Sequence, residues 1–168
     1  MKTYLDNNIA SAMVRDDLAD PVEMAAVRKM QAANGQPIIV TSRETWREQD
    51  RTKDPAVRAQ LQQARDKLEL VTEDHLMLGN RALYDNRGMF YGNSPILTEM
   101  VDAELFAAFK KAGLKAADAR HLMYAVHNGC DRFITTDPDF INRRTQLEAV
   151  GRGIRIQKPS ELLAELGL

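Results

Sequence analysis

Short apolar runs alternate with longer amphipathic segments along the chain. The short runs are rich in β-branched and aromatic residues and are bounded by turn-forming residues, which predicts buried strands. The predicted strands are residues 3–5, 37–41, 68–72, 130–136 and 154–156. The segments between them carry apolar residues at helical spacing. The predicted helices are 9–14, 21–33, 42–67 with a break near Asp54-Pro55, 102–111, 115–128 and a last helix capped by Ser160.

Strands that alternate with helices favour a parallel sheet covered by helices on both faces. We therefore predict a single α/β domain over residues 1–168, with three layers and a parallel sheet of about five strands. The segment 73–98 has the least regular pattern, because Gly79, Gly88, Gly92 and Pro95 interrupt it. We predict a short helix followed by a loop in this segment.

The composition excludes several classes of protein. The chain has 23 Lys and Arg residues and 24 Asp and Glu residues, which gives a net charge of −1. This balance argues against a strongly basic surface that binds DNA non-specifically. The single cysteine, Cys130, excludes an intramolecular disulfide and a thiolate zinc site. No apolar run approaches the ~20 residues that a membrane span needs. The first six residues lack the apolar core of a signal peptide, so we expect a cytoplasmic protein.

Four acidic residues stand where the predicted strands and helices approach one edge of the sheet. Asp6 follows the first strand and Asp137 the fourth, while Asp118 lies in the first turn of the helix before the fourth strand. Glu48 lies about two turns into the helix after the second strand. Ligands of open α/β sheets bind at the carboxyl ends of the strands, where the strand order reverses. If the first and fourth strands are neighbours there, the four carboxylates share one crevice.

Several carboxylates in one crevice repel one another, and each raises the pKa of the others. A divalent cation removes this conflict. A set of oxygen ligands suits Mg²⁺ or Mn²⁺ better than Zn²⁺. Such a metal activates water and stabilises the charge that develops on a phosphate during phosphodiester hydrolysis.

The same acids also have purely structural interpretations. Asp137 precedes Pro138 and suits a helix N-cap, and Asp118 in a first helical turn complements the helix dipole. Asp6 could cap the helix that follows it. An acid at the end of a buried strand is nevertheless costly without a partner.

The helix-borne acid has two candidates. Thr41 and Glu44 fit a capping box, in which the Glu44 side chain returns to the backbone and Glu48, one turn later, faces the site. Without this capping box, Glu44 replaces Glu48 as the candidate ligand.

Five segments, in order along the chain, resemble the motifs of PIN-domain proteins. They are a strand ending in Asp followed by Asn, a polar helix start carrying Glu, an Asp-Ala pair opening a helix, a strand running into Thr-x-Asp and Asp-Phe, and a closing strand and helix. The segments are 4–8 (YLDNN), 42–48 (SRETWRE), 117–121 (ADARH), 131–140 (DRFITTDPDF) and 156–163 (IQKPSELL).

This resemblance implies a PIN-like fold and a crevice of acids that binds Mg²⁺ or Mn²⁺. The implied ligands and catalytic residues are Asp6, Glu48, Asp118 and Asp137. It also implies endoribonuclease activity on RNA, often as the toxin of a toxin–antitoxin pair, with an antitoxin protein as partner. The apolar face of residues 102–111 is expected in the core or in a homodimer contact.

Other polar residues are candidates for supporting roles. Hydroxyl and amide groups near the acids could orient them or the metal-bound waters, or could equally be local caps. The candidates are Asn8, Ser42, Thr45 and Thr135. Arg143 and Arg144 could hold the RNA backbone, or could belong to a solvated charged face. The histidines, His75, His121 and His127, are expected to be partly exposed or core residues.

A second functional class stays open: a PIN-like module that binds RNA or protein without catalysis. A phosphatase with an aspartate nucleophile would carry Asp-x-Asp after the first strand, whereas Asp6 is followed by Asn7-Asn8. A mononucleotide-binding protein would carry a Gly-rich loop there, and the sequence has none. The nuclease is therefore the leading prediction.

Overall fold

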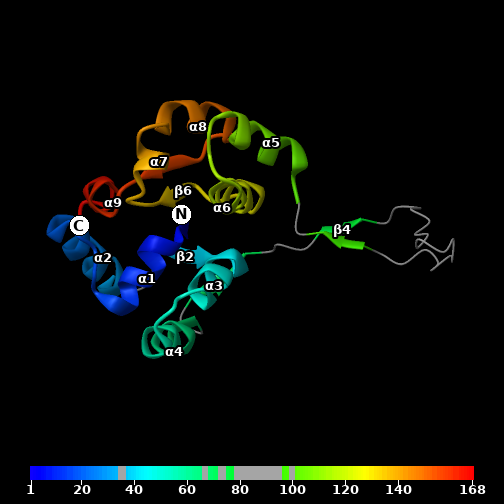
Figure 1. The fold of residues 1–168 in the computed structure, drawn as a ribbon. Helices are drawn as coiled ribbons and strands as arrows, with labels where there is room; N and C mark the ends of the chain where they lie inside the picture. Colours follow the sequence, from blue (N-terminus) through cyan, green and yellow to red (C-terminus); the bar gives the residue numbers. More distant parts are fainter. Residues whose placement is uncertain (34–36, 66–67, 72–74, 78–95, 99–100) are drawn as a thin grey trace, which may run out of the picture.

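A computed structural model describes residues 1–33, 37–65, 68–71, 75–77, 96–98 and 101–168 (Figure 1). The strands are β1 (Lys2–Leu5), β2 (Ile38–Thr41), β3 (Glu69–Leu70), β4 (His75–Met77), β5 (Ile96–Thr98), β6 (Arg132–Ile134) and β7 (Arg155–Gln157). The helices are α1 (Asn7–Arg15), α2 (Pro21–Ala32), α3 (Arg43–Asp50), α4 (Pro55–Ala64), α5 (Ala103–Lys111), α6 (Ala116–His127), α7 (Pro138–Ile141), α8 (Arg144–Val150) and α9 (Pro159–Leu166). Among the described residues, no helix is both long and apolar enough to cross a bilayer.

Five strands form an all-parallel sheet in the order β3-β2-β1-β6-β7. The central strand β1 pairs with β2 on one side and with β6 on the other, so that Tyr4 lies between Val40 and Phe133. The chain order reverses at β1, and the predicted neighbourhood of the first and fourth strands is confirmed. The carboxyl ends of β1 and β6 therefore meet at the switch point of the sheet.

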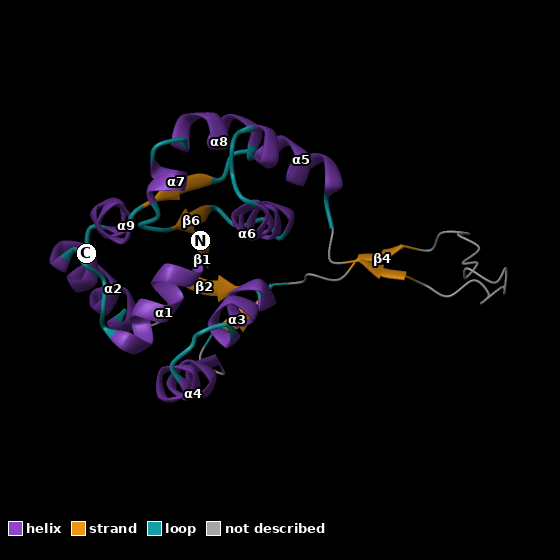
Figure 2. Ribbon diagram, viewed as in Figure 1, coloured by secondary structure: helices purple, strands orange, loops and turns teal. Residues whose placement is uncertain are grey.

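Helices cover both faces of the sheet, as Figure 2 shows. Because successive side chains of a strand point to opposite faces, Tyr4 and Phe133 pack toward α5 and α6, while Leu5 and Ile134 pack toward α1, α2 and α9. The apolar face of α5 lies in the first of these cores, with Phe109 fully buried. The predicted three-layer α/β/α architecture is confirmed.

Asp–Pro pairs and glycine set several helix boundaries as the sequence predicts. Asp54 caps α4 and Asp137 caps α7, each followed by Pro at the first helical position. The predicted end of α6 at Asn128-Gly129 is confirmed, and Gly129 has a φ of 65° that favours glycine.

Two predictions of local structure are wrong. Where a short helix and a loop were expected between 73 and 98, β4 and β5 form a separate antiparallel two-stranded sheet; the rest of that segment lies outside the described residues. Ser160 does not cap α9. The N-cap is Lys158, whose backbone N–H donates to the Glu161 carboxylate, and Ser160 instead donates its N–H and hydroxyl to buried Glu23.

Candidate active site

The carboxyl ends of β1 and β6 bring Asp6 and Asp137 to the same edge of the sheet. The backbone N–H of Asp6 donates to the carbonyl of Ile134. The Thr135 hydroxyl donates to Asp6 Oδ2 at 2.7 Å and accepts from the backbone N–H of Asp137 at 2.9 Å. Thr135 thus connects the two strand ends, and its hydroxyl contacts both a carboxylate and a local backbone N–H, which matches each of the two alternatives left open by the sequence.

Asp6 is the most deeply placed of the four acids, with only 7% of its surface exposed. Burial raises the pKa of Asp6 to about 6, and the nearby Glu48 carboxylate adds to the rise. His121, the Thr135 hydroxyl and the backbone N–H of Asn7 oppose the rise. Asp6 also caps α1 by accepting from that N–H at 2.7 Å. Asp6 therefore does cap α1, but this hydrogen bond does not offset the rise in pKa that burial of the carboxylate causes.

Asp118 lies in the first turn of α6, as predicted, and is partly exposed. Burial raises the pKa of Asp118, and the carboxylates of Asp137 and Glu48 raise it further. Lys115 and His121 act in the opposite direction. Electrostatic interactions thus connect the four acids in a series, Asp6 with Glu48, Glu48 with Asp118 and Asp118 with Asp137, although they come from four separate parts of the chain.

The choice between Glu44 and Glu48 follows from their partners on α3. The predicted capping box of Thr41 and Glu44 is wrong: α3 begins after Ser42, which makes no side-chain cap. Glu44 is buried and accepts from Arg120 of α6 at 2.8 Å and from Arg47 at 3.2 Å. Burial alone would raise the pKa of Glu44, but these arginines bring it below its ordinary value. Glu44 is thus a structural ion-pair residue, and Glu48 is the helix-borne acid of the cluster.

The remaining candidate polar residues differ in what they contact. Asn8 donates its amide to the hydroxyls of Thr135 and Thr136 at 3.3 and 3.2 Å, so it supports the same strand end as Asp6. The Ser42 hydroxyl accepts from Tyr4, and the Thr45 hydroxyl bonds that of Thr41. These two hydroxyls hold α3 against the sheet.

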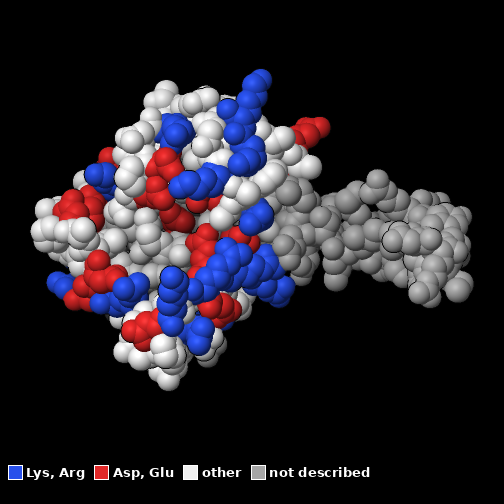
Figure 3. Space-filling model, in the orientation of Figure 1, with Lys and Arg blue, Asp and Glu red and all other residues white. Residues whose placement is uncertain are grey.

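The basic residues predicted to contact RNA are held in ion pairs. Arg143 bonds Asp139 at 2.8 Å, and Arg144 bonds both oxygens of Glu161. Lys115 is more exposed: its ammonium lies 3.2 Å from Asp139, and its side chain is 78% exposed. Because Lys115 also lowers the pKa of Asp118, it lies at the rim of the acid cluster. Figure 3 shows acidic side chains near the centre of this face, between α6 and α3, with basic side chains beside them.

The expectation that His121 is a core residue is confirmed, but its contact with Glu48 was not predicted. This side chain is 1% exposed, and its Nε2 lies 3.5 Å from Glu48 Oε2. Burial lowers the pKa of His121, but Glu48, Asp6 and Glu44 outweigh burial, and the pKa lies above its ordinary value. The spacing of Asp118 and His121, three residues apart on one helix, was the available signal.

The donor set suits a hard divalent cation. In the described ranges, His, Cys, Asp and Glu form no ready-made group of three metal ligands. Mg²⁺ does not require such a group, because it keeps several waters and binds through one or two carboxylates and substrate phosphates. Burial, and to a smaller extent the neighbouring carboxylates, raise the pKa values of Asp6 and Asp118, and a bound cation would favour the charged form of both. The residues present therefore fit Mg²⁺ or Mn²⁺.

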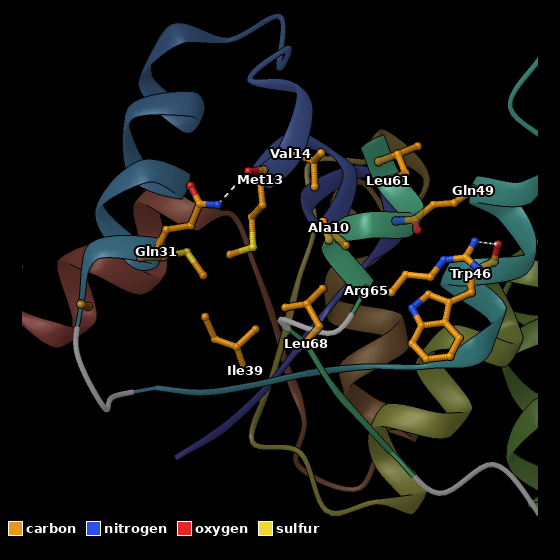
Figure 4. Close-up of a pocket in the computed structure, with 13 residues that line it drawn as sticks. Ala10, Met13, Val14, Gln31, Ile39, Trp46, Gln49, Leu61, Arg65 and Leu68 are labelled. Atoms are coloured by element: carbon orange, nitrogen blue, oxygen red, sulfur yellow. Dashed lines mark hydrogen bonds between the residues drawn. The ribbon is translucent and has the colours of Figure 1, made fainter. Parts of the chain in front are cut away.

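A mostly apolar pocket of about 420 Å³ lies between α1, α2, β2, α3 and α4 (Figure 4). The side chains of Met13, Ile39 and Leu68 line it, and Trp46 and Arg65 border it. None of the four acids lines this pocket, so it is separate from the candidate site.

No protein-family model matches this chain, and no curated protein is significantly similar to it in sequence. The functional argument therefore rests on the residues and on their arrangement.

Proposed function

We propose that this chain is a PIN-like, metal-dependent endoribonuclease that hydrolyses RNA phosphodiester bonds. The observation that carries the proposal is that four acids lie near the switch point of a parallel sheet, where Glu48 raises the pKa of Asp6 and of Asp118, and Asp137 raises that of Asp118. Burial and the neighbouring carboxylates raise the pKa of both Asp6 and Asp118. A protein that only needed helix caps would have no reason to concentrate charge in this way.

Asp6, Glu48, Asp118 and Asp137 would hold Mg²⁺ or Mn²⁺, which when bound supplies Lewis-acid stabilisation of the phosphate charge. Asp118 is partly exposed and so is accessible from solvent. The proton of the attacking water would pass to bulk water, which also supplies the proton that the leaving oxygen takes up. The water oxygen bonds to phosphorus while the bond from phosphorus to the leaving oxygen breaks.

We infer that Lys115, whose exposed ammonium lies 3.2 Å from Asp139, contacts the RNA backbone beside the acids. The motif resemblance supports RNA as the substrate. The proposal includes a cytoplasmic location, a homodimer, and an antitoxin protein as partner if the chain is a toxin.

The test is cleavage of a mixed set of labelled RNAs by the purified protein with Mn²⁺ or Mg²⁺, with EDTA as a control. Asp6→Asn is compared with Asp131→Asn, because Asp131 lies at the opposite end of β6 and binds the backbone N–H of Lys2. We expect metal-dependent cleavage by the wild type and by Asp131→Asn, and none by Asp6→Asn. If the wild type neither cleaves RNA nor binds a divalent ion by calorimetry, the catalytic proposal fails and the non-catalytic binding module takes its place.

A further inference from the structure

A buried hydrogen-bonded chain runs beneath the acid cluster and connects β1 with α3 and α6. Tyr4 is fully buried, and its hydroxyl donates to Ser42 Oγ at 2.6 Å. The same hydroxyl lies 2.7 Å from Nδ1 of His121. Tyr4 also stacks on Phe133, with ring centroids 5.4 Å apart and planes inclined by 8°. The tyrosine ring is thus fixed by packing and its hydroxyl by two hydrogen-bonding partners.

The His121 ring is held with its second nitrogen toward Glu48. Since Nδ1 is engaged by Tyr4, Nε2 is the nitrogen that remains, and it lies 3.5 Å from Glu48 Oε2. Among the described residues, Nε2 makes no closer hydrogen bond. A buried polar nitrogen without a close partner is costly, so packing alone would favour an apolar residue at this position. The hydrogen bond with Tyr4 accounts for Nδ1, and the contact with Glu48 is what accounts for Nε2.

The hydrogen-bonded side chains of Ser42, Tyr4 and His121 connect the elements that carry the proposed ligands. Tyr4 is two residues before Asp6 on β1, and His121 is three residues after Asp118 on α6. Ser42 immediately precedes α3, which carries Glu48. A displacement of one of these three elements would therefore shift the carboxylates carried by the other two.

We propose that His121 is a positioning residue that holds the Glu48 carboxylate toward the acid cluster, and that Tyr4 fixes the His121 ring for this purpose. This role rests on the proposed nuclease function, because it concerns the geometry of the same site. Groups that orient a metal ligand from behind typically change metal affinity or activity by about 10- to 100-fold when they are removed.

The test compares four variants. Tyr4→Phe removes only the hydroxyl that anchors the ring. His121→Leu removes the ring nitrogens and keeps an apolar side chain, whereas His121→Gln keeps an N–H donor. The matched control is His127→Gln, an exposed histidine on the same helix. The measurements are the Mn²⁺ dissociation constant by calorimetry, kcat and KM for RNA, and the melting temperature of each variant.

We expect Tyr4→Phe and His121→Leu to weaken Mn²⁺ binding and lower kcat by about tenfold or more, with KM for RNA nearly unchanged. His121→Gln should recover much of the lost Mn²⁺ affinity, and His127→Gln should match the wild type. If Mn²⁺ affinity and kcat fall in proportion to the melting temperature, and His121→Gln does not recover them, His121 has a structural role and the proposal is overturned.

Two further outcomes separate this proposal from the nuclease proposal. If the wild type binds Mn²⁺ and cleaves RNA while Tyr4→Phe and His121→Leu do the same, the positioning role alone fails. If the wild type does neither, the proposed function fails and the positioning role falls with it. Electron paramagnetic resonance tests whether His121 binds the metal directly. Coupling of bound Mn²⁺ to a nitrogen nucleus that disappears in His121→Leu would make His121 a direct ligand and overturn the positioning role.

Discussion

Neutralising Asp6 should stabilise the metal-free protein at neutral pH. Burial raises the pKa of Asp6 from 3.8 to about 6, so its carboxyl group binds its proton more strongly in the folded than in the unfolded state. Stability therefore falls as pH rises from about 4 to about 6, and the full cost is present above that window. A shift of this size corresponds to about 3 kcal/mol in the free energy of unfolding.

The Asp6→Asn variant removes the charge but not the helix cap. The asparagine carbonyl still accepts from the N–H of Asn7, whereas its amide faces the Thr135 hydroxyl that now donates to Asp6. Losing that hydrogen bond costs about 1 kcal/mol, which leaves a net gain of about 2 kcal/mol. The expected rise in melting temperature is roughly 4–8 °C at about pH 7.5.

Thermal unfolding of both proteins in EDTA, at about pH 7.5 and near pH 4, measures this gain. Near pH 4 most of the gain should be absent, because Asp6 is then protonated in the folded wild type and about 40% protonated in the unfolded chain, so little of the difference between the two states remains. Saturating Mn²⁺ should raise the melting temperature of the wild type more than that of the variant, since a ligand that binds only the folded state stabilises it. A variant that is destabilised equally at both pH values would refute the argument from buried charge.

Three other perturbations have defined outcomes. Lys115→Ala should raise KM for RNA severalfold with kcat nearly unchanged, because the proposed contact of its exposed ammonium is with the RNA backbone and not with the reacting atoms; steady-state cleavage kinetics measure this. Arg120→Leu should lower the free energy of unfolding by about 2–4 kcal/mol in urea titrations, because it removes the shorter of the two ion pairs that the buried Glu44 carboxylate makes with Arg120 and Arg47. Phe133→Ala should cost about 3–5 kcal/mol by the same measurement, since the ring is fully buried in the core, and a loss below about 1 kcal/mol would contradict that packing.

The sequence allowed much of the sheet to be predicted, because its strands are short apolar runs bounded by turn residues. The positions of Asp6 and Asp137 at strand ends followed from the same pattern and from the switch-point rule. The helix-borne acids Glu48 and Asp118 required only the expectation that flanking helices approach that edge.

Long-range pairings could not be predicted in this way. The Tyr4–His121 contact joins residues 117 positions apart, and the Glu44–Arg120 ion pair joins residues 76 apart. No local pattern encodes which partner a buried polar side chain will find. The capping box assigned to Glu44 failed for this reason, because a distant arginine competes successfully with the nearby backbone.

The position of β1 in the sheet determines when the site can form during synthesis. Thr3 pairs with Arg132 and Leu5 with Ile134, so the central strand lacks one of its two neighbours until those late residues are made. At a translation rate of about 5–20 residues per second, this interval lasts roughly 6–26 s. During that time Asp6 has neither Asp137 nor Thr135 beside it, and one edge of β1 is unpaired. Site assembly is therefore a late event in synthesis, and a chain truncated before residue 132 should lack the pairing of β1 with β6 and, with it, Asp137 and Thr135 beside Asp6.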